Sequence, residues 1–281
     1  MSEAPDAGVR PVAAATVLLV RDRIGSSGLE VLMVERHREI EFAGGATVFP
    51  GGKVHPSDAS PALREHCQGA EGLDEAALSL RVAAIRESFE ECGVLLARAR
   101  GKAPGRALVP AARLADLWKR YRRMLERHEL SMEELVRREN LELACDLLVP
   151  FAHWITPEGL PKRFDTHFFL VRAPSDQVAA HDGHELVGAR WLTPNEALAD
   201  ADAGRRSIIF PTRMNLSKLA RSESADAAIA AARAQPVVTV LPRIDRSAKG
   251  AFLRIPVEAG YDLVEAPVEE ALQARPRVST A

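Results

Sequence analysis

The sequence is short of cysteine, has no long apolar run and carries no excess of charge of either sign. Its 281 residues include three cysteines, Cys67, Cys92 and Cys145, which lie far apart and form no CxxC pair. This spacing argues against a disulfide framework and a zinc ribbon, and it suits a reducing compartment. Hydrophobic residues make up 47% and charged residues 27% of the chain, a balance typical of globular proteins. We therefore expect a cytoplasmic protein.

No segment has the composition of a membrane anchor or an export signal. The longest apolar run, VAAATVLLV, is far too short to cross a bilayer and is better interpreted as a buried strand. The N-terminal MSEAPDAGVRP lacks the basic and apolar regions of a signal peptide, and the C-terminal RPRVSTA contains no anchor motif. The formal net charge of -2 gives no basic field for nucleic acid. We expect neither a membrane nor a nucleic acid as partner.

Strand-like and helix-like segments alternate along the chain, which predicts a mixed α/β (α+β) fold. Strands are predicted at residues 12–20, 29–36, 46–49, 145–155, 163–171 and 184–192, and helices at 111–128, from 131, at 194–201, 213–221 and 225–234. The last two strands, 236–242 and 251–257, are predicted to pair with each other. Because repeats and flexible linkers are lacking, we expect one domain over residues 9–281, with a loop insertion at about 59–73, a helical insertion at about 105–145 and a C-terminal extension at about 205–281.

The clearest predicted element is an amphipathic helix from Asp74 to Cys92. Asp74 is a suitable N-cap, and Gly93 stands where a left-handed residue would end the helix. One face of the helix is apolar and is formed by Leu78, Val82, Ile85, Phe89 and Cys92.

Three glutamates crowd the end of this helix. Glu87, Glu90 and Glu91 follow an i, i+3, i+4 spacing, which puts their Cβ atoms about 5–6 Å apart on one face. Like charges repel, and the helix dipole makes negative charge at this end less favourable still. Mg²⁺ relieves both effects because it takes oxygen ligands and accepts carboxylates together with substrate phosphates. On these residues alone, an ordinary solvated acidic face stays an alternative.

With their neighbours, the glutamates resemble the signature of the Nudix hydrolases, G-x5-E-x7-R-E-U-x-E-E-x-G-U, in which U is a bulky aliphatic residue. The second half matches from Arg86 to Val94, except that Ser88 replaces an aliphatic residue. The first half matches at Gly52, with Asp58 in place of the glutamate. Asp58 and Arg86 are separated by 20 more residues than the signature has there.

The interrupted signature and the stretch VFPGGKV resemble one branch of the family, the peroxisomal-type coenzyme A diphosphatases and their bacterial relatives. A second motif of coenzyme A enzymes, L-L-x-x-R-[SA]-x3-R-x3-G-x3-F, is partly kept at Leu32, Arg36, Gly45 and Phe49. His37 replaces its small residue and Glu41 its second arginine. Because of these two changes, ADP-ribose, NADH or another nucleoside diphosphate derivative stays open as an alternative substrate.

The resemblance implies a Nudix α/β/α sandwich with a mixed sheet and a Mg²⁺- or Mn²⁺-dependent pyrophosphatase. Coenzyme A or acyl-coenzyme A would be cleaved to 3′,5′-ADP and (acyl-)4′-phosphopantetheine. The implied metal ligands are Glu87, Glu90 and Glu91, and the implied binding or positioning residues are Arg36, Gly51, Gly52 and Arg86. Glu185 resembles a late glutamate that serves as general base in many Nudix enzymes, while a water-exposed carboxylate is its alternative interpretation.

Two other interpretations stay open. A catalytically silent Nudix module that binds a nucleotide would keep the fold without the reaction, and both a monomer and a homodimer fit the sequence. Asp165 and His167 alternate along a predicted half-buried strand. We interpret them as polar groups satisfied in the core, with substrate contact as the alternative.

Overall fold

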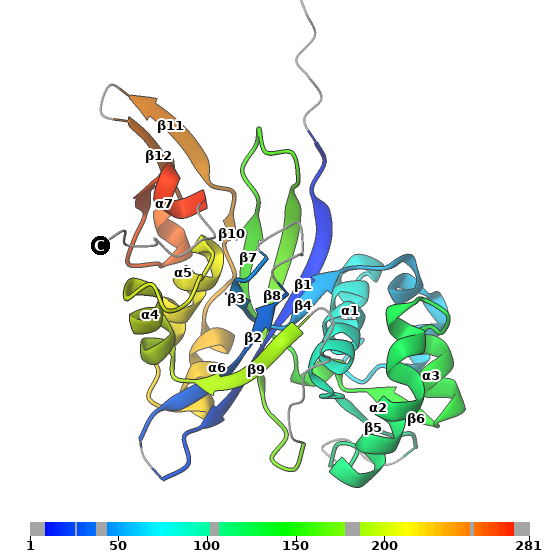
Figure 1. Cartoon of the computed structure of the whole chain (residues 1–281). Coiled ribbons are helices and arrows are strands. Elements are labelled where there is room, and N and C mark those ends of the chain that lie inside the picture. Colours follow the sequence, from blue (N-terminus) through cyan, green and yellow to red (C-terminus); the bar gives the residue numbers. More distant parts are fainter. Residues whose placement is uncertain are drawn as a thin grey trace, which may run out of the picture.

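A mixed β-sheet forms the middle layer of the molecule, and helices cover both of its faces (Figure 1). The computed structural model describes residues 9–25, 27–37, 44–101, 107–177, 186–247 and 250–272. Within these ranges the sheet has eight strands, six of them in the order β10-β7-β8-β1-β2-β3, with β4 beside β1 and β9 beside β2. The α/β sandwich expected from the sequence is confirmed.

Both parallel and antiparallel pairs occur in this sheet. The strands are β1 (Val12–Asp22), β2 (Leu29–Arg36), β3 (Thr47–Val48), β4 (Gly51–Lys53), β7 (Val149–Ile155), β8 (Phe164–Arg172), β9 (Leu186–Leu192) and β10 (Thr239–Val240). The pairs β1–β8 and β7–β10 are parallel, and the other neighbours are antiparallel. The long β1–β8 ladder joins residues that are 152 positions apart in the chain, such as Val12 and Phe164, so the sheet depends on non-local pairing.

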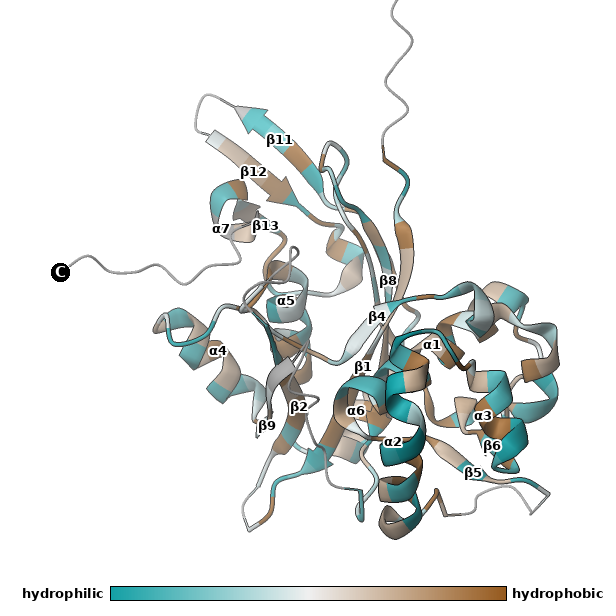
Figure 2. Ribbon diagram, turned by 45° about the vertical axis from the view of Figure 1, so that its right-hand side comes forward, coloured by the Kyte–Doolittle hydropathy of each residue, from teal (hydrophilic) through white to brown (hydrophobic). Residues whose placement is uncertain are grey.

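Each face of the sheet buries its own hydrophobic cluster. On one face lie α1 (Glu75–Cys92), α2 (Ala111–Glu126), α3 (Met132–Arg138), the 3-10 turns η1 (Pro56–Ala59), η2 (Pro61–His66) and η3 (Cys145–Leu147), and the short pair β5 (Ala97–Ala99) and β6 (Leu141–Leu143). Hydrophobic residues line the strands in the middle of the molecule, whereas α2 carries many hydrophilic residues (Figure 2).

The second face is covered by the C-terminal third of the described chain. It carries α4 (Pro194–Asp202), α5 (Phe210–Leu219) and α6 (Ala225–Ala234), followed by β11 (Arg243–Ser247), β12 (Gly250–Arg254), η4 (Val257–Ala259), β13 (Glu265–Pro267) and α7 (Val268–Leu272). In the part of the chain that the structure describes, every helix is too short or too polar to cross a membrane.

The helix predicted from Asp74 to Cys92 is confirmed together with both of its ends. The Asp74 side chain accepts a hydrogen bond from the Ala77 N–H, and α1 ends at Gly93 with φ 66°. All five residues of the predicted apolar face are buried. Glu90 and Glu91 are buried as well, so these two acids lie inside the molecule rather than at the rim of its core.

Two predictions about strands were wrong. The strand predicted at 145–155 begins only at Val149, because residues 145–147 form the turn η3. The segments 236–242 and 251–257 do not pair with each other: β10 joins β7 in the main sheet, and β12 pairs with β11 and β13. Burial explains β10, since Val240 is 1% exposed in the second hydrophobic cluster. Two residues are too few to carry a periodic signal, so tertiary contacts decide this pairing.

Candidate active site

Two of the three glutamates of α1, Glu87 and Glu91, lie against the backbone of β4. The Gly51 N–H donates a hydrogen bond to the Glu91 carboxylate over 2.8 Å. Glu90 and Glu91 are 7% and 6% exposed, and Glu87 lies beside Gly52. The end of α1 and the Gly-Gly strand therefore form two walls of one site, with carboxylates between them.

Both glycines make close contacts. A Cβ atom on Gly52 would lie 2.4 Å from the Glu87 carboxylate oxygen. A Cβ atom on Gly51 would lie 2.4 Å from the backbone oxygen of Ala15 on β1. Both distances are far below van der Waals contact, so a side chain on Gly51 would clash with the backbone of β1 and one on Gly52 would displace the Glu87 carboxylate.

Arg86 connects η1, β4 and the acidic end of α1. Its Nε and Nη2 atoms donate to the two carboxylate oxygens of Asp58, each over 3.0 Å. Nη1 donates to Glu87 over 2.8 Å and to Glu90 over 3.2 Å, and Nη2 also reaches the Lys53 carbonyl at 2.8 Å. The arginine is only 4% exposed, which makes this a buried, charge-assisted network.

Asp58 lies inside this network, although 20 more residues separate it from Arg86 than the signature has there. Its side chain is 1% exposed and accepts a second hydrogen bond from the His55 N–H at 2.8 Å. The inserted residues fold into 3-10 turns beside α1 and bring Asp58 back to Arg86. In the folded chain the two halves of the signature are thus in direct contact.

The site concentrates negative charge around the Arg86 guanidinium. Burial raises the pKa of Glu90 to about 8, and Glu87 adds to this shift while Arg86 opposes it. Burial would lower the pKa of Arg86, but Glu87 and Asp58 outweigh it and raise that pKa. Arg86 carries one positive charge and contacts three carboxylates, and a fourth, that of Glu91, accepts the hydrogen bond from Gly51. This excess of hard oxygen ligands fits a divalent cation such as Mg²⁺ or Mn²⁺.

The remaining predicted residues are Arg36, which the structure describes, and residues outside the described chain. Arg36 ends β2, where its N–H donates to the Ala46 carbonyl over 3.0 Å. Its half-buried side chain has no hydrogen-bond partner for Nε among the described residues. Glu185, the expected general base, and Glu41 both lie outside the described residues.

Two pairs of histidines were missed as pairs by the sequence analysis. His55 and His128 stack with ring centroids 4.0 Å apart next to Asp58, and burial lowers the pKa of His128. His153 and His167 stack at 3.9 Å on neighbouring strands. Each pair joins residues from separate segments, so only the strand register or the loop path could have revealed it.

The layered fold and this acidic helix end beside a Gly-Gly strand define a protein of the Nudix hydrolase class. A crystal structure of a NUDIX hydrolase from Alicyclobacillus acidocaldarius matches with a TM-score of 0.62 and 28% sequence identity, covering 79% of this chain and 96% of that one. A family model described as the NUDT19 Nudix domain matches residues 68–219, and the chain belongs to this family. The Nudix branch expected from the sequence is thereby confirmed.

Two curated relatives are similar to a larger part of the chain than residues 68–219. The acyl-coenzyme A diphosphatase NUDT19 of Homo sapiens is 29% identical over 213 residues, which cover 61% of this chain and 55% of that protein. The protein of the same name from Xenopus laevis is 25% identical over 229 residues, covering 69% and 60% respectively. The chain thus spans less than two thirds of the length of these relatives.

Proposed function

We propose that the chain is a Mg²⁺- or Mn²⁺-dependent diphosphatase that cleaves coenzyme A or acyl-coenzyme A to 3′,5′-ADP and (acyl-)4′-phosphopantetheine. The observation that carries the proposal is the buried carboxylate set of α1 facing the bare backbone of Gly51 and Gly52. A bound divalent cation would lower the cost of burying these carboxylates close together. The activity named for the human relative supports the coenzyme A substrate.

In this proposal, Glu87, Glu90 and Glu91 would hold the metal. When bound, the ion would offset the negative charge of the pyrophosphate and of the carboxylates. Gly51 and Gly52 let phosphate oxygens approach the backbone closely. Arg86 acts as a positioning residue, because its contacts with Glu87 and Glu90 fix the carboxylates and its contacts with Asp58 fix the insertion.

The reaction itself is a hydrolysis. The oxygen of a water molecule bonds to one phosphorus of the pyrophosphate, and the bond between that phosphorus and the bridging oxygen breaks. The bridging oxygen leaves with the other phosphate. Glu185, as the general base that the family resemblance implies, would accept the proton that the water loses. Arg36 would contribute to substrate binding from the end of β2, as the motif of the coenzyme A enzymes implies.

A substrate panel tests the proposal. The purified chain is incubated with Mg²⁺ or Mn²⁺ and, separately, coenzyme A, acyl-coenzyme A, ADP-ribose, NADH and nucleoside triphosphates. We expect metal-dependent release of 3′,5′-ADP from coenzyme A, and its loss in Glu91→Gln. Glu75→Gln is the matched control, because it makes the same change on the exposed first turn of α1 and leaves turnover intact.

Each alternative has its own outcome in this assay. Turnover of ADP-ribose or NADH without coenzyme A would contradict the coenzyme A substrate and would agree with His37 and Glu41 in the partial motif. Absence of turnover on the whole panel, together with tight nucleotide binding, would favour a catalytically silent module. Repeating the reaction in ¹⁸O-labelled water identifies the attacked phosphorus, because the label appears in only one of the two products.

A further inference from the structure

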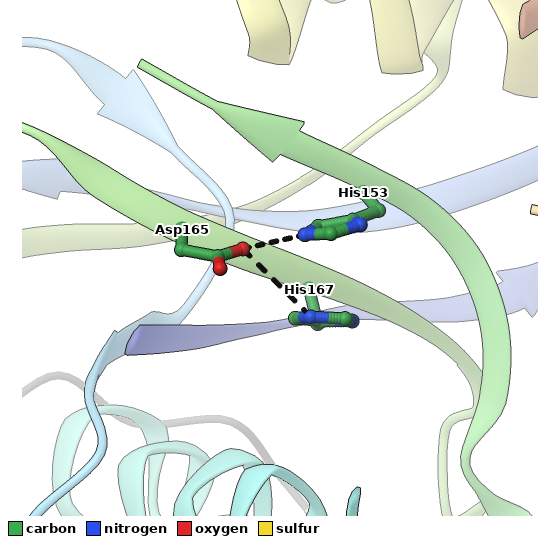
Figure 3. A group of neighbouring side chains, drawn as sticks. All are labelled: His153, Asp165 and His167. Carbon is green, nitrogen blue, oxygen red and sulfur yellow. Dashed lines mark hydrogen bonds and ion pairs between the residues drawn. The ribbon is translucent and has the colours of Figure 1, made fainter. Parts of the chain in front are cut away.

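A second group of metal-ligating side chains lies on β7 and β8. His153 and His167 are direct partners in the antiparallel β7–β8 ladder. Asp165 precedes His167 by two residues on β8, so all three side chains project from the same face of the sheet. One ligand atom from each residue lies within 4.8 Å of the other two (Figure 3).

Both imidazoles direct the same nitrogen at the same carboxylate oxygen. His153 Nε2 lies 2.5 Å and His167 Nε2 lies 3.8 Å from Asp165 Oδ1. The second distance is too long for a hydrogen bond. An ion about 2.0–2.2 Å from each of the three atoms would take the place of the His153–Asp165 hydrogen bond. It would also bring His167 Nε2 and Asp165 Oδ1 closer together. Small rotations of the side chains would suffice, because the three atoms already converge.

The second ring nitrogen of His153 also has a hydrogen-bond partner. Its Nδ1 atom lies 2.8 Å from the Thr239 hydroxyl of β10, the strand beside β7. Metal-binding histidines usually have their second ring nitrogen in such a hydrogen bond, which fixes the ring and the nitrogen that faces the ion. The alternative role, a polar cluster satisfied within the strands, explains the His153–Asp165 contact and the stacking of His167 on His153. It does not require the Nε2 atom of His167 to face the same carboxylate oxygen.

The cluster is accessible from solvent. The side chains of His153, Asp165 and His167 are 15%, 37% and 34% exposed, so an ion could enter without opening the core. Three protein ligands leave a further coordination position for water or for an anionic oxygen, as in open zinc sites.

The cluster shares a sheet face with the candidate active site. Ala15 of β1 pairs with His167 on one side and with Gly52 on the other. Neighbouring strands are about 4.8 Å apart, so the Cα atoms of His167 and Gly52 are about 10 Å apart across the sheet. Ala15 belongs to the hydrophobic cluster beneath α1, which identifies the face.

We propose that His153, Asp165 and His167 form a binding site for a first-row transition-metal ion, with Zn²⁺ as the best fit, separate from the glutamates of α1. Two imidazole nitrogens and one carboxylate oxygen suit Zn²⁺ and its neighbours, whereas Mg²⁺ prefers oxygen ligands alone. The two sites thus select different ions within one sheet face. The proposal does not depend on the diphosphatase activity, since it concerns binding only.

Metal binding to the full, tag-free chain tests the proposal. After chelator treatment, Zn²⁺ is titrated calorimetrically in excess Mg²⁺, which saturates the glutamates. We expect one Zn²⁺ per chain, with affinity lowered at least about 10–100-fold in His153→Ala, Asp165→Asn and His167→Ala. His128→Ala, which removes a ring from the other stacked pair, and Glu91→Gln should bind Zn²⁺ like the unmutated chain. Unchanged affinity in the three cluster variants, or loss in Glu91→Gln, would overturn the site.

Spectroscopy of the unmutated chain keeps the test decisive if a cluster variant fails to fold. Co²⁺ in the site should give visible absorption without the near-ultraviolet bands of thiolate ligands, which excludes binding at the buried Cys67 and Cys145. X-ray absorption of the Zn²⁺ form should show the outer-shell scattering of imidazole. A ligand shell of oxygen or sulfur alone contradicts the proposal.

Discussion

At Gly51 and Gly52 the absence of a side chain has two different consequences. A Cβ atom on Gly51 would meet the backbone of β1, which cannot move without breaking the β1–β4 ladder. A Cβ atom on Gly52 would meet the end of the Glu87 side chain, which can rotate away. The first glycine is therefore needed for the fold, and the second for the position of one carboxylate.

The pair of variants Gly51→Ala and Gly52→Ala separates these roles. We expect Gly51→Ala to lower the free energy of unfolding by about 1–3 kcal/mol, as overpacking does. Gly52→Ala should change stability by less than about 1 kcal/mol but displace Glu87, so that Mg²⁺ affinity and turnover fall together. Urea unfolding and metal titration of both variants measure the two quantities. Equal loss of stability in both would contradict the distinction.

Arg86 and Asp58 form the centre of the buried network, and their interaction can be measured directly. Lysine keeps the charge of Arg86 but lacks the planar fork that serves Asp58, Glu87 and the Lys53 carbonyl together. We expect Arg86→Lys to lower the free energy of unfolding by about 1–3 kcal/mol.

A double-mutant cycle with Asp58→Asn provides the check on this pair. The coupling energy between residues of one such network is about 0.5–3 kcal/mol, measured by chemical unfolding of the two single variants and the double variant. Additive effects would mean that Asp58 does not act through Arg86, and the insertion would then be held by other contacts.

Among the elements, α1 has a C-terminal end that one residue sets. Gly93 has φ 66°, and a Cβ atom there would meet Trp118 only at an ordinary 3.5 Å. Gly93→Ala should therefore cost about 1–2 kcal/mol of stability through backbone strain alone. Gly188→Ala on β9 is the matched control, because it has open space and no left-handed backbone. Thermal unfolding of both variants measures the difference, and equal melting temperatures would contradict it.

The comparison of α1 with the other elements shows what a single sequence reveals. Asp74, the apolar face and Gly93 lie within one segment, so local rules predicted the helix and both ends. The pairing of β10 with β7 and the contact of Asp58 with Arg86 join distant segments, and nothing local encodes them. The spacing of the three glutamates is local, so the sequence could predict them as a candidate site, whereas the His153–Asp165–His167 cluster depends on the register of two strands.

For the molecule as a whole, the C-terminal segment is part of the same fold as the site. Trp154 of β7 donates a hydrogen bond to the Tyr261 hydroxyl, which in turn donates to Asn215 of α5. All three residues are buried, and Tyr261 also contributes to the second hydrophobic cluster. The C-terminal segment thus covers the face of the sheet opposite the candidate active site. Unfolding of the helices on either face would therefore expose the sheet.

Metal binding should couple to the stability of this whole unit in a pH-dependent way. In the metal-free protein the pKa of Glu90 is raised to about 8 from its ordinary value of 4.5. Between these values the folded chain keeps a proton that the unfolded chain has lost, so this group lowers stability as pH rises. In the proposed site, Mg²⁺ would bind the ionised carboxylate and would stabilise the folded chain by mass action. Its stabilising effect should therefore grow with pH.

We expect the rise in melting temperature caused by millimolar Mg²⁺ to be larger at about pH 9 than at about pH 6, because at the lower pH the ion competes with the proton on Glu90. Glu90→Gln is the internal control: it removes the titrating group, so the metal-free melting temperature should depend less on pH and the remaining gain from Mg²⁺ should be nearly constant. An equal rise in melting temperature at both pH values in the unmutated chain would show that Glu90 is not a ligand. Glu87 and Glu91 would then be the remaining metal ligands.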